Sequence, residues 1–230
     1  MNSDNLSRLE TNLRADALHI RKAALDELAL LPADEAVPIL QRLMDTPDFG
    51  LRRLAVMGLG NHRSAAAFQS LKSILEQDKD ASVLSEAANS LFDFGEAAIP
   101  VLQSLFDRVD HWLVRQTIIS LFIDTERYEV LFSLAEKALE DETQTVKEVG
   151  ILALSHVWKS PFKVQALVLI AQLSRDSFWR NRWRAAIALQ ECHDPQAQML
   201  IAALQQDEHF RVVAAALEVA SYWQEEGRWT

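Results

Sequence analysis

The sequence is poor in cysteine, glycine and proline, and these shortages exclude several classes of protein. Among its 230 residues there are one cysteine, Cys192, six glycines and six prolines. A single cysteine forms no internal disulfide and no four-cysteine zinc site. Hydrophobic residues make up 49 % of the chain, which is too many for a disordered protein. A chain of this size buries enough surface to fold without covalent cross-links.

Positive charge and long apolar runs are also scarce. Lysine and arginine number 23 against 33 aspartate and glutamate, so the formal net charge is −10. Nucleic-acid binding depends on a cationic face, and we therefore expect no nucleic-acid partner. Apolar runs such as 149–154 and 166–171 fall far short of the ~20 residues that cross a bilayer. Because the N-terminus lacks the apolar core of a signal peptide, we expect a cytoplasmic protein without a membrane span.

What the sequence does contain is a repeat. Seven similar segments have starts separated by 31, 32, 30, 33, 35 and 29 residues. Counted from each start as position 0, position +4 is small in all seven segments and position +8 is leucine in six. Residues four apart share one helical face, so the pattern predicts a helix that packs closely on another helix. The segments begin at Ile20, Leu51, Val83, Leu113, Val146, Asn181 and Phe210.

A second apolar stripe precedes each segment, as Leu6, Leu9 and Leu13 do before the first one. We call the earlier helix of each pair A and the later helix B. The prolines lie between helices or near helix starts, where the ring is tolerated. We therefore predict an all-α fold, a right-handed α-α superhelix of about seven helical pairs. It forms a single domain over residues 1–230, with repeats at about residues 5–31, 34–62, 64–94, 96–125, 128–159, 162–192 and 195–225.

Charged residues recur in phase with this pattern. An aspartate precedes each B helix from the second onward, and position +1 is basic in five repeats. An aspartate at a helix N-terminus caps free N–H groups and suits the helix dipole. We expect the basic residues to bridge to aspartates of neighbouring repeats, forming an Asp–Arg ladder that is interrupted in the third and fourth copies.

A pair of helices spanning about 31 residues, with Asp in the turn and V-R-x-x-A-x-x-A-L on the second helix, resembles the HEAT repeat. The variety that it resembles most is the phycobilisome-lyase type, over roughly residues 5–225. The resemblance implies an α-solenoid from a cyanobacterium. Lyases of this type attach open-chain tetrapyrroles, the bilins, to cysteines of light-harvesting proteins. Relatives without lyase activity are linked to phycobilisome breakdown or to iron–sulfur carrier proteins.

The B helices of a solenoid line its concave side, and positions +2, +6 and +10 lie off the buried face. These positions are mostly polar in the first three repeats and turn apolar in repeats four to six. An exposed apolar patch with a polar rim is typical of a protein–protein site. The alternative is that tight curvature closes the groove and packs these residues together. The predicted partner-binding residues are Arg115, Ile119, Ile123, Glu148, Leu152, His156, Trp183, Arg184 and Ile187.

The segment 178–184, Phe-Trp-Arg-Asn-Arg-Trp-Arg, is unusual because tryptophan and arginine pairs share helix faces. We expect Trp179 to pack between repeats and Arg182 to join the ladder. The sequence leaves two alternatives for Arg180 and Arg184, which are either solvated or able to bind carboxylates.

Recognisable catalytic motifs are missing. The sequence has no Gly-rich phosphate loop, no G-x-S-x-G and no H-E-x-x-H. Residues 192–194, Cys-His-Asp, end a B helix, and adjacent helical residues do not face one ligand, so we expect a buried free thiol. We predict no catalytic residue, no metal ligand and no cofactor.

The sequence therefore favours a non-catalytic protein-interaction scaffold, or an assembly or chaperone-like adaptor, that binds its partner in the C-terminal half. By the family resemblance, the partner is a phycobiliprotein or an iron–sulfur carrier protein. The alternative is a subunit of a phycocyanobilin lyase or a bilin-handling factor. A bilin needs arginines for its propionates, a carboxylate for its pyrrole nitrogens and an apolar wall, for which Arg115, Glu148, Trp183 and Arg184 are the candidates.

Overall fold

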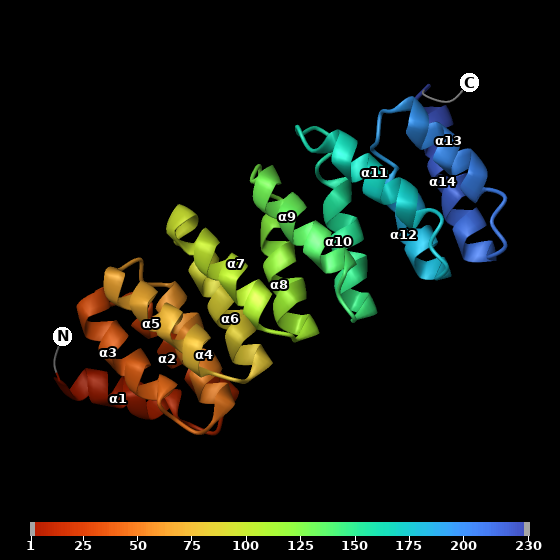
Figure 1. The fold of residues 1–230 in the computed structure, drawn as a ribbon. Helices are drawn as coiled ribbons and strands as arrows, with labels where there is room; N and C mark the ends of the chain where they lie inside the picture. The colour runs from red at the N-terminus through yellow and green to blue at the C-terminus, as the bar shows by residue number, and fades with distance from the viewer. Residues whose placement is uncertain (1–2, 228–230) are drawn as a thin grey trace. The chain divides into compact units, whose positions relative to one another are not determined.

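The computed structural model describes residues 3–227, which fold into fourteen α-helices and one short 3-10 helix and contain no strand (Figure 1). This confirms the predicted all-α fold of about seven helical pairs. The A helices are α1 (Ser3–Leu13), α3 (Ala33–Met44), α5 (Ala65–Gln77), α7 (Ile99–Arg108), α9 (Tyr128–Leu139), α11 (Lys163–Leu173) and α13 (Pro195–Leu204). The B helices are α2 (Leu18–Leu28), α4 (Phe49–Gly60), α6 (Ala81–Phe92), α8 (Trp112–Ile123), α10 (Gln144–Ser155), α12 (Trp179–Ala188) and α14 (Phe210–Glu225).

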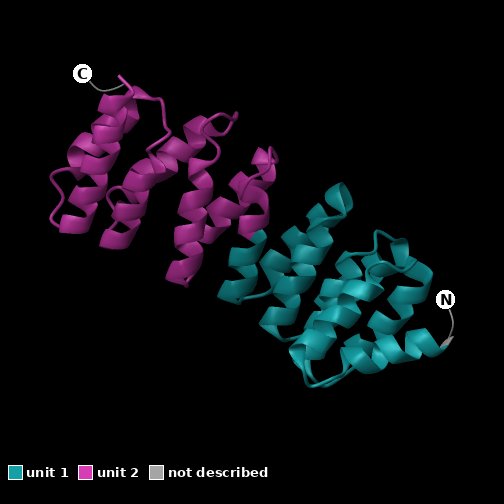
Figure 2. Cartoon of the chain, turned by 180° about the vertical axis from the view of Figure 1, so that it is seen from behind, with its two compact units in different colours: residues 1–118 teal, residues 119–230 magenta. Residues whose placement is uncertain are grey.

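The chain divides into two compact units, residues 1–118 and residues 119–230 (Figure 2). Unit 1 holds α1 to α7 and the first part of α8, and unit 2 holds the remainder. Within unit 1, α4 packs against both α3 and α6. Within unit 2, α12 lies between α10 and α14 and contacts both. That the whole chain forms a single solenoid domain with the repeat bounds given above stays a prediction.

The register of the repeat is more regular than the sequence pattern indicated. In every B helix, the first position of the buried face is the third helical residue, and these residues are 31, 32, 31, 32, 35 and 31 apart. This moves position 0 from Leu113 to Val114 and from Phe210 to Val212. Val114 and Val212 are fully buried, whereas Phe210 is 72 % exposed. The register predicted for the fourth and seventh segments was therefore wrong.

The corrected register explains which side chains form the core. Positions +4 and +8 are buried in all seven B helices. Position +5 is buried as well in the first six, for example at Val56 and Ile151. The small residue expected at +4 is present in six helices, and α8 has Ile118 there instead. Arg115, one residue after Val114, now occupies the basic position, so the fourth copy keeps this feature.

Small residues on B helices allow the A helix to approach closely. Gly150, at position +4 of α10, faces α9: a Cβ added there would lie 2.6 Å from the Cβ of Ala138 and 3.2 Å from the carbonyl oxygen of Ala135. No alanine fits at that separation unless one backbone moves. Gly58 of α4 is also tight, but its near neighbours are the ends of the Leu40 and Leu25 side chains, which can rotate.

We expect Gly150→Ala to lower the free energy of unfolding by about 1–2 kcal/mol, because overpacking against Ala138 costs more than alanine adds in helix propensity. Gly58→Ala should lower the free energy of unfolding by clearly less, since the ends of the neighbouring leucine side chains can move aside. Urea titration followed by circular dichroism measures both changes. A loss at Gly58 as large as that at Gly150 would contradict this account.

Aspartates before the B helices act in two different ways. Asp48 and Asp80 are N-caps, accepting hydrogen bonds from the N–H groups of Gly50 and Ser82 at 2.8 and 2.9 Å. The aspartates of the predicted ladder are not N-caps, and two of them, Asp45 and Asp78, are the C-caps of α3 and α5. Asp207, for example, accepts from the N–H of His209 at 2.8 Å, and this bond shapes the loop that leads into α14.

Two rungs of the Asp–Arg ladder have the same geometry. Nε of Arg52 lies 2.6 Å from Asp78, and Nε of Arg182 lies 2.7 Å from Asp207. Each arginine adds a second bond from Nη2 to the same carboxylate, at 3.1 and 2.9 Å. Nη1 of each also donates to two backbone carbonyls in the loop before its own helix. One rung of the predicted ladder is thus present in each unit, and Arg182 belongs to it as expected. Arg21, in contrast, donates to the backbone carbonyl of Ala15.

The Arg182–Asp207 rung should contribute strongly to stability because both side chains are only 9 % exposed. Asp207→Asn leaves a buried guanidinium without its counter-charge, and we expect it to lower the free energy of unfolding by roughly 2–4 kcal/mol at neutral pH. Thermal unfolding measures the loss. Glu208→Gln is the control, since Glu208 touches the same arginine but its side chain is 85 % exposed and should contribute little.

Lowering the pH should remove the difference in free energy of unfolding between the wild type and Asp207→Asn. Hydrogen bonding to Arg182 is the main cause that lowers the pKa of Asp207 in the folded protein. The stabilisation that the ionised Asp207 carboxylate gives is therefore present above the ordinary pKa of the carboxyl group. It is lost as the pH falls through the lower pKa of the folded protein. We expect the two stability curves to converge below about pH 4. If the difference in free energy of unfolding between the wild type and Asp207→Asn stays constant as the pH falls, charge pairing is not the cause of that difference.

Candidate functional site

The nine predicted partner-binding residues are divided between the two compact units. Arg115 belongs to unit 1, where it pairs with Asp110 at 3.0 Å and lies over the Phe106 ring, 5.5 Å from its centroid. The other eight predicted residues lie in unit 2. The candidate site lies within unit 2, so Arg115 is not part of it.

The prediction that Ile119 is exposed was wrong. Its exposed fraction is zero, because the corrected register places it at the buried position +5 of α8. Ile123 is half-buried. The outward positions of α8 are held by Gln116, Ser120 and Asp124, so this helix contributes a polar surface. The apolar stripe predicted for the fourth repeat does not exist.

A buried ion cluster joins α10 to α12 in unit 2. Glu148 is 7 % exposed, and its two carboxylate oxygens pair with two arginines of α12. Oε1 lies 2.7 Å from Nη2 of Arg180, and Oε2 lies 3.0 Å from Nη2 of Arg184. The side-chain amide of Gln144 also donates to Glu148, at 3.3 Å, and to Asn181 at 2.8 Å. Both arginines left open by the sequence therefore pair with a carboxylate.

Apolar side chains lie beside this cluster. Leu152 and Ile187 hold the same position, +6, of the adjacent helices α10 and α12. Leu152 is 41 % exposed, while Trp183 and Ile187 are half-buried. The guanidinium of Arg184 lies over the Trp183 ring at 4.4 Å from the centroid. We call Leu152, Trp183, Ile187, Arg180 and Arg184 the α10–α12 face. His156 is exposed and ends α10 as its C-cap.

The sequence reasoning missed a second group of rings at the N-terminal ends of α12 and α14. We call Phe178, Trp179, His209 and Phe210 the aromatic shelf. Trp179 stacks on His209 of the next repeat with centroids 4.0 Å apart and planes 4° from parallel, and His209 in turn stacks on Phe210 at 5.1 Å. Trp179 thus packs between repeats, as predicted. The corrected register would have revealed the shelf, because both aromatic pairs lie at positions −3 and −2.

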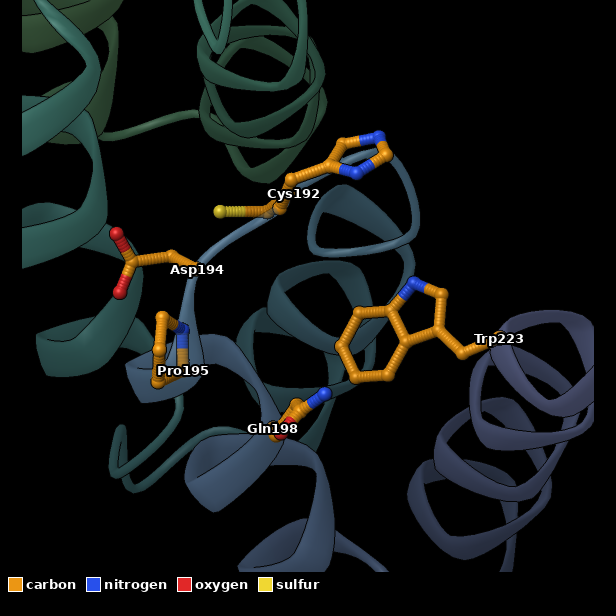
Figure 3. A pocket seen from close by; sticks show the side chains of 6 residues that line it. Cys192, Asp194, Pro195, Gln198 and Trp223 are labelled. Carbon is orange, nitrogen blue, oxygen red and sulfur yellow. The ribbon is translucent and has the colours of Figure 1, made fainter. Parts of the chain in front are cut away.

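A cavity of about 220 Å³ in unit 2 contains the only cysteine (Figure 3). Its lining comes from the loop after α12, the start of α13 and Trp223 of α14. Trp223 donates from Nε1 to the carbonyl of Gln190 at 2.6 Å. Asp194 caps α13 and pairs with Lys163 at 3.0 Å, so it does not act on the cysteine as a base. Burial raises the pKa of the Cys192 thiol to about 11, which confirms the expected buried free thiol.

The described residues contain neither a metal-binding cluster nor a membrane-spanning helix. Residues 3–227 include no group of three or more His, Cys, Asp or Glu side chains placed to hold a metal ion. The helices in the same range are also too short or too polar to span a membrane.

We expect Cys192 to react slowly with Ellman's reagent in the native protein. A pKa of about 11 lowers the thiolate fraction at pH 8 about 100-fold relative to an ordinary cysteine, and burial adds a barrier to access. In urea the reaction should become fast and stoichiometric. Free cysteine is the reference, and native protein that reacts at a comparable rate would contradict a structural role for this thiol.

Comparisons with known proteins agree with the fold. A model of HEAT repeats matches residues 6–91 and 45–123, which together span just over half of the chain. No curated protein sequence gives a match. Among solved structures, YibA of Escherichia coli is similar with a TM-score of 0.64 and 15 % identity, covering 98 % of this chain and 87 % of that one.

Two other structures are similar over most of this chain. The AP-3 complex has a TM-score of 0.60 and 17 % identity, covering 96 % of this chain and 45 % of that one. The complex of CpcE and CpcF of phycocyanin lyase from Nostoc sp. PCC7120 has a TM-score of 0.48 and 18 % identity, covering 96 % and 87 %. At such identities these similarities concern the fold alone.

Proposed function

Because the chain belongs to the HEAT-repeat family, we propose that it is a non-catalytic protein-interaction scaffold, an assembly or chaperone-like adaptor whose partner binds on the α10–α12 face. Proteins of this architecture present rows of side chains on successive helices, and such rows suit an extended contact with another protein. The charged pairs of the ladder and the thiol of Cys192 are used within the fold, so they leave no chemistry for a reaction.

One observation carries the choice of this face. Leu152 keeps 41 % of its surface exposed and holds the same helix position as Ile187 on the neighbouring helix. A leucine in that position gains from burial by a partner, and a neighbouring tryptophan is a favoured hot-spot residue. The two arginines at its edge supply the polar rim that a protein–protein site needs.

Leu152→Glu tests the proposal because it puts a charge at the centre of the face without touching the core. We expect the variant to lose its partner in affinity purification with quantitative mass spectrometry, and its thermal midpoint to stay within a few degrees of the wild type. Val168→Glu on α11 is the control, since Val168 is similarly exposed at 49 % but lies on an A helix. Equal partner recovery from both variants would remove the α10–α12 face as the binding site.

Partner identity follows from the family resemblance. We propose a phycobiliprotein or an iron–sulfur carrier protein as the class of partner, to be tested by titrating purified phycocyanin and a purified carrier against the wild type and Leu152→Glu. Binding that Leu152→Glu abolishes supports the assignment. Absence of binding to both proteins would leave a scaffold with a different partner.

The bilin-handling alternative stays a prediction, and one of the residues named for it is already engaged within the fold. A bilin requires a carboxylate that is free to face its pyrrole nitrogens, and both oxygens of Glu148 already pair with arginines. A red-shifted and narrowed absorption band on mixing with phycocyanobilin would restore this alternative.

A further inference from the structure

The aromatic shelf exposes more apolar surface than the α10–α12 face. Phe178 is 41 % exposed and Phe210 is 72 % exposed, beside the N-termini of α12 and α14. The Trp179–His209 stack lies between them, and the ring of Trp179 is 6.4 Å from that of Trp183. Exposed rings gathered in one patch are typical of a surface that another protein covers.

Guanidinium groups lie on these rings. Arg211 is 5.5 Å from the centroid of Trp179 and 5.8 Å from that of Phe210, and no ion pair engages it among the described residues. A guanidinium stacked on a ring keeps its N–H groups in one plane directed outward. That arrangement suits a carboxylate, which accepts two parallel hydrogen bonds from such a group.

In the Glu148 cluster the carboxylate is inside and the arginines are outside, whereas Arg182 is buried together with Asp207. The side chains of Glu148 and Asp207 are 8 % and 9 % exposed, while those of Arg180 and Arg184 are 43 % and 33 % exposed. Glu208 is the exposed exception, and Arg182 binds it at 3.2 Å. Arg180 and Arg184 are therefore more exposed than the carboxylate that they share, on a chain whose net charge is −10. The N-termini of α12 and α14 add a favourable dipole for anions.

We propose that the aromatic shelf and its arginines bind an acidic segment of a protein partner, one that carries Asp or Glu side chains next to an aromatic or aliphatic side chain. The carboxylates bind Arg211, with Arg180 and Arg184 contributing from the adjoining face. The apolar side chain covers Phe178 and Phe210. The inference rests on the proposed scaffold function and specifies the chemistry of the partner.

Fluorescence anisotropy of a labelled synthetic peptide tests this surface directly. The probe is a short peptide of alternating Glu and Phe, and the comparison peptides replace Glu with Gln or with phosphoserine. We expect the Glu peptide to bind the full chain, to weaken about tenfold or more as salt rises from about 0.05 to 0.5 M, and to bind better than the Gln peptide. Failure of the Glu peptide to bind at low salt, or binding of the phosphoserine peptide alone, would overturn the proposal.

Two variants locate the site. Arg211→Gln and Phe210→Ala should each weaken binding of the Glu peptide at least about fivefold. Both side chains are exposed, so the fold should be retained. The control is Arg63→Gln in unit 1, because Arg63 also lies over a ring, Phe94, at 5.6 Å but pairs with Asp93. If Arg63→Gln weakened binding of the Glu peptide equally, the peptide would bind exposed arginines in general and not the aromatic shelf.

Failure of this inference differs from failure of the scaffold function. A natural partner that is lost with Leu152→Glu but retained with Arg211→Gln and Phe210→Ala would overturn the acidic-segment proposal and leave the scaffold intact. A partner retained by all three variants would overturn both.

Discussion

The phase of the B helices controls which side chains are buried, which are paired and which reach the surface. Each B helix places its third residue at the start of the buried face, and the loop before the helix determines where that residue falls. In unit 2, the loop before α14 is held by Asp207, which accepts a hydrogen bond from the backbone N–H of His209 and binds Arg182 of the previous repeat. Helix start and repeat stacking are thus set by one carboxylate.

This coupling explains how much of the fold the sequence predicted. Helical pairs, their number and the role of the ladder arginines were predictable, because small residues and leucines recur four apart in most repeats. The register of α8 was not, because residues 117–123 are apolar on nearly all sides of the helix and Leu113 and Val114 are both apolar. In α14, Phe210 has the size of a core residue but lies outside the buried face. Periodicity alone does not distinguish an apolar residue that is buried in the core from one that is exposed on the surface.

The candidate site was predictable only in part, for a physical reason that differs from residue to residue. Leu152 was assigned to the surface correctly because α10 has a clear polar and apolar face. The pairing of Glu148 with Arg180 and Arg184 joins residues 32 and 36 positions apart in the sequence. It depends on the relative orientation of two neighbouring helices. Such a contact requires the three-dimensional register, and a displacement of one residue along α12 would separate the charges.

The arrangement of charge in unit 2 also bears on why an acidic chain would keep a basic surface. Burying Glu148 without a counter-charge would cost several kcal/mol, so one arginine is needed for stability. The second arginine goes beyond neutralisation, and a third, Arg211, lies on aromatic rings without a carboxylate among the described residues. Exposed guanidinium groups on a chain of net negative charge attract an anionic partner. Selectivity for an acidic partner therefore arises from the same ion cluster that fastens α12 to α10, and function at this surface is tied to the packing beneath it.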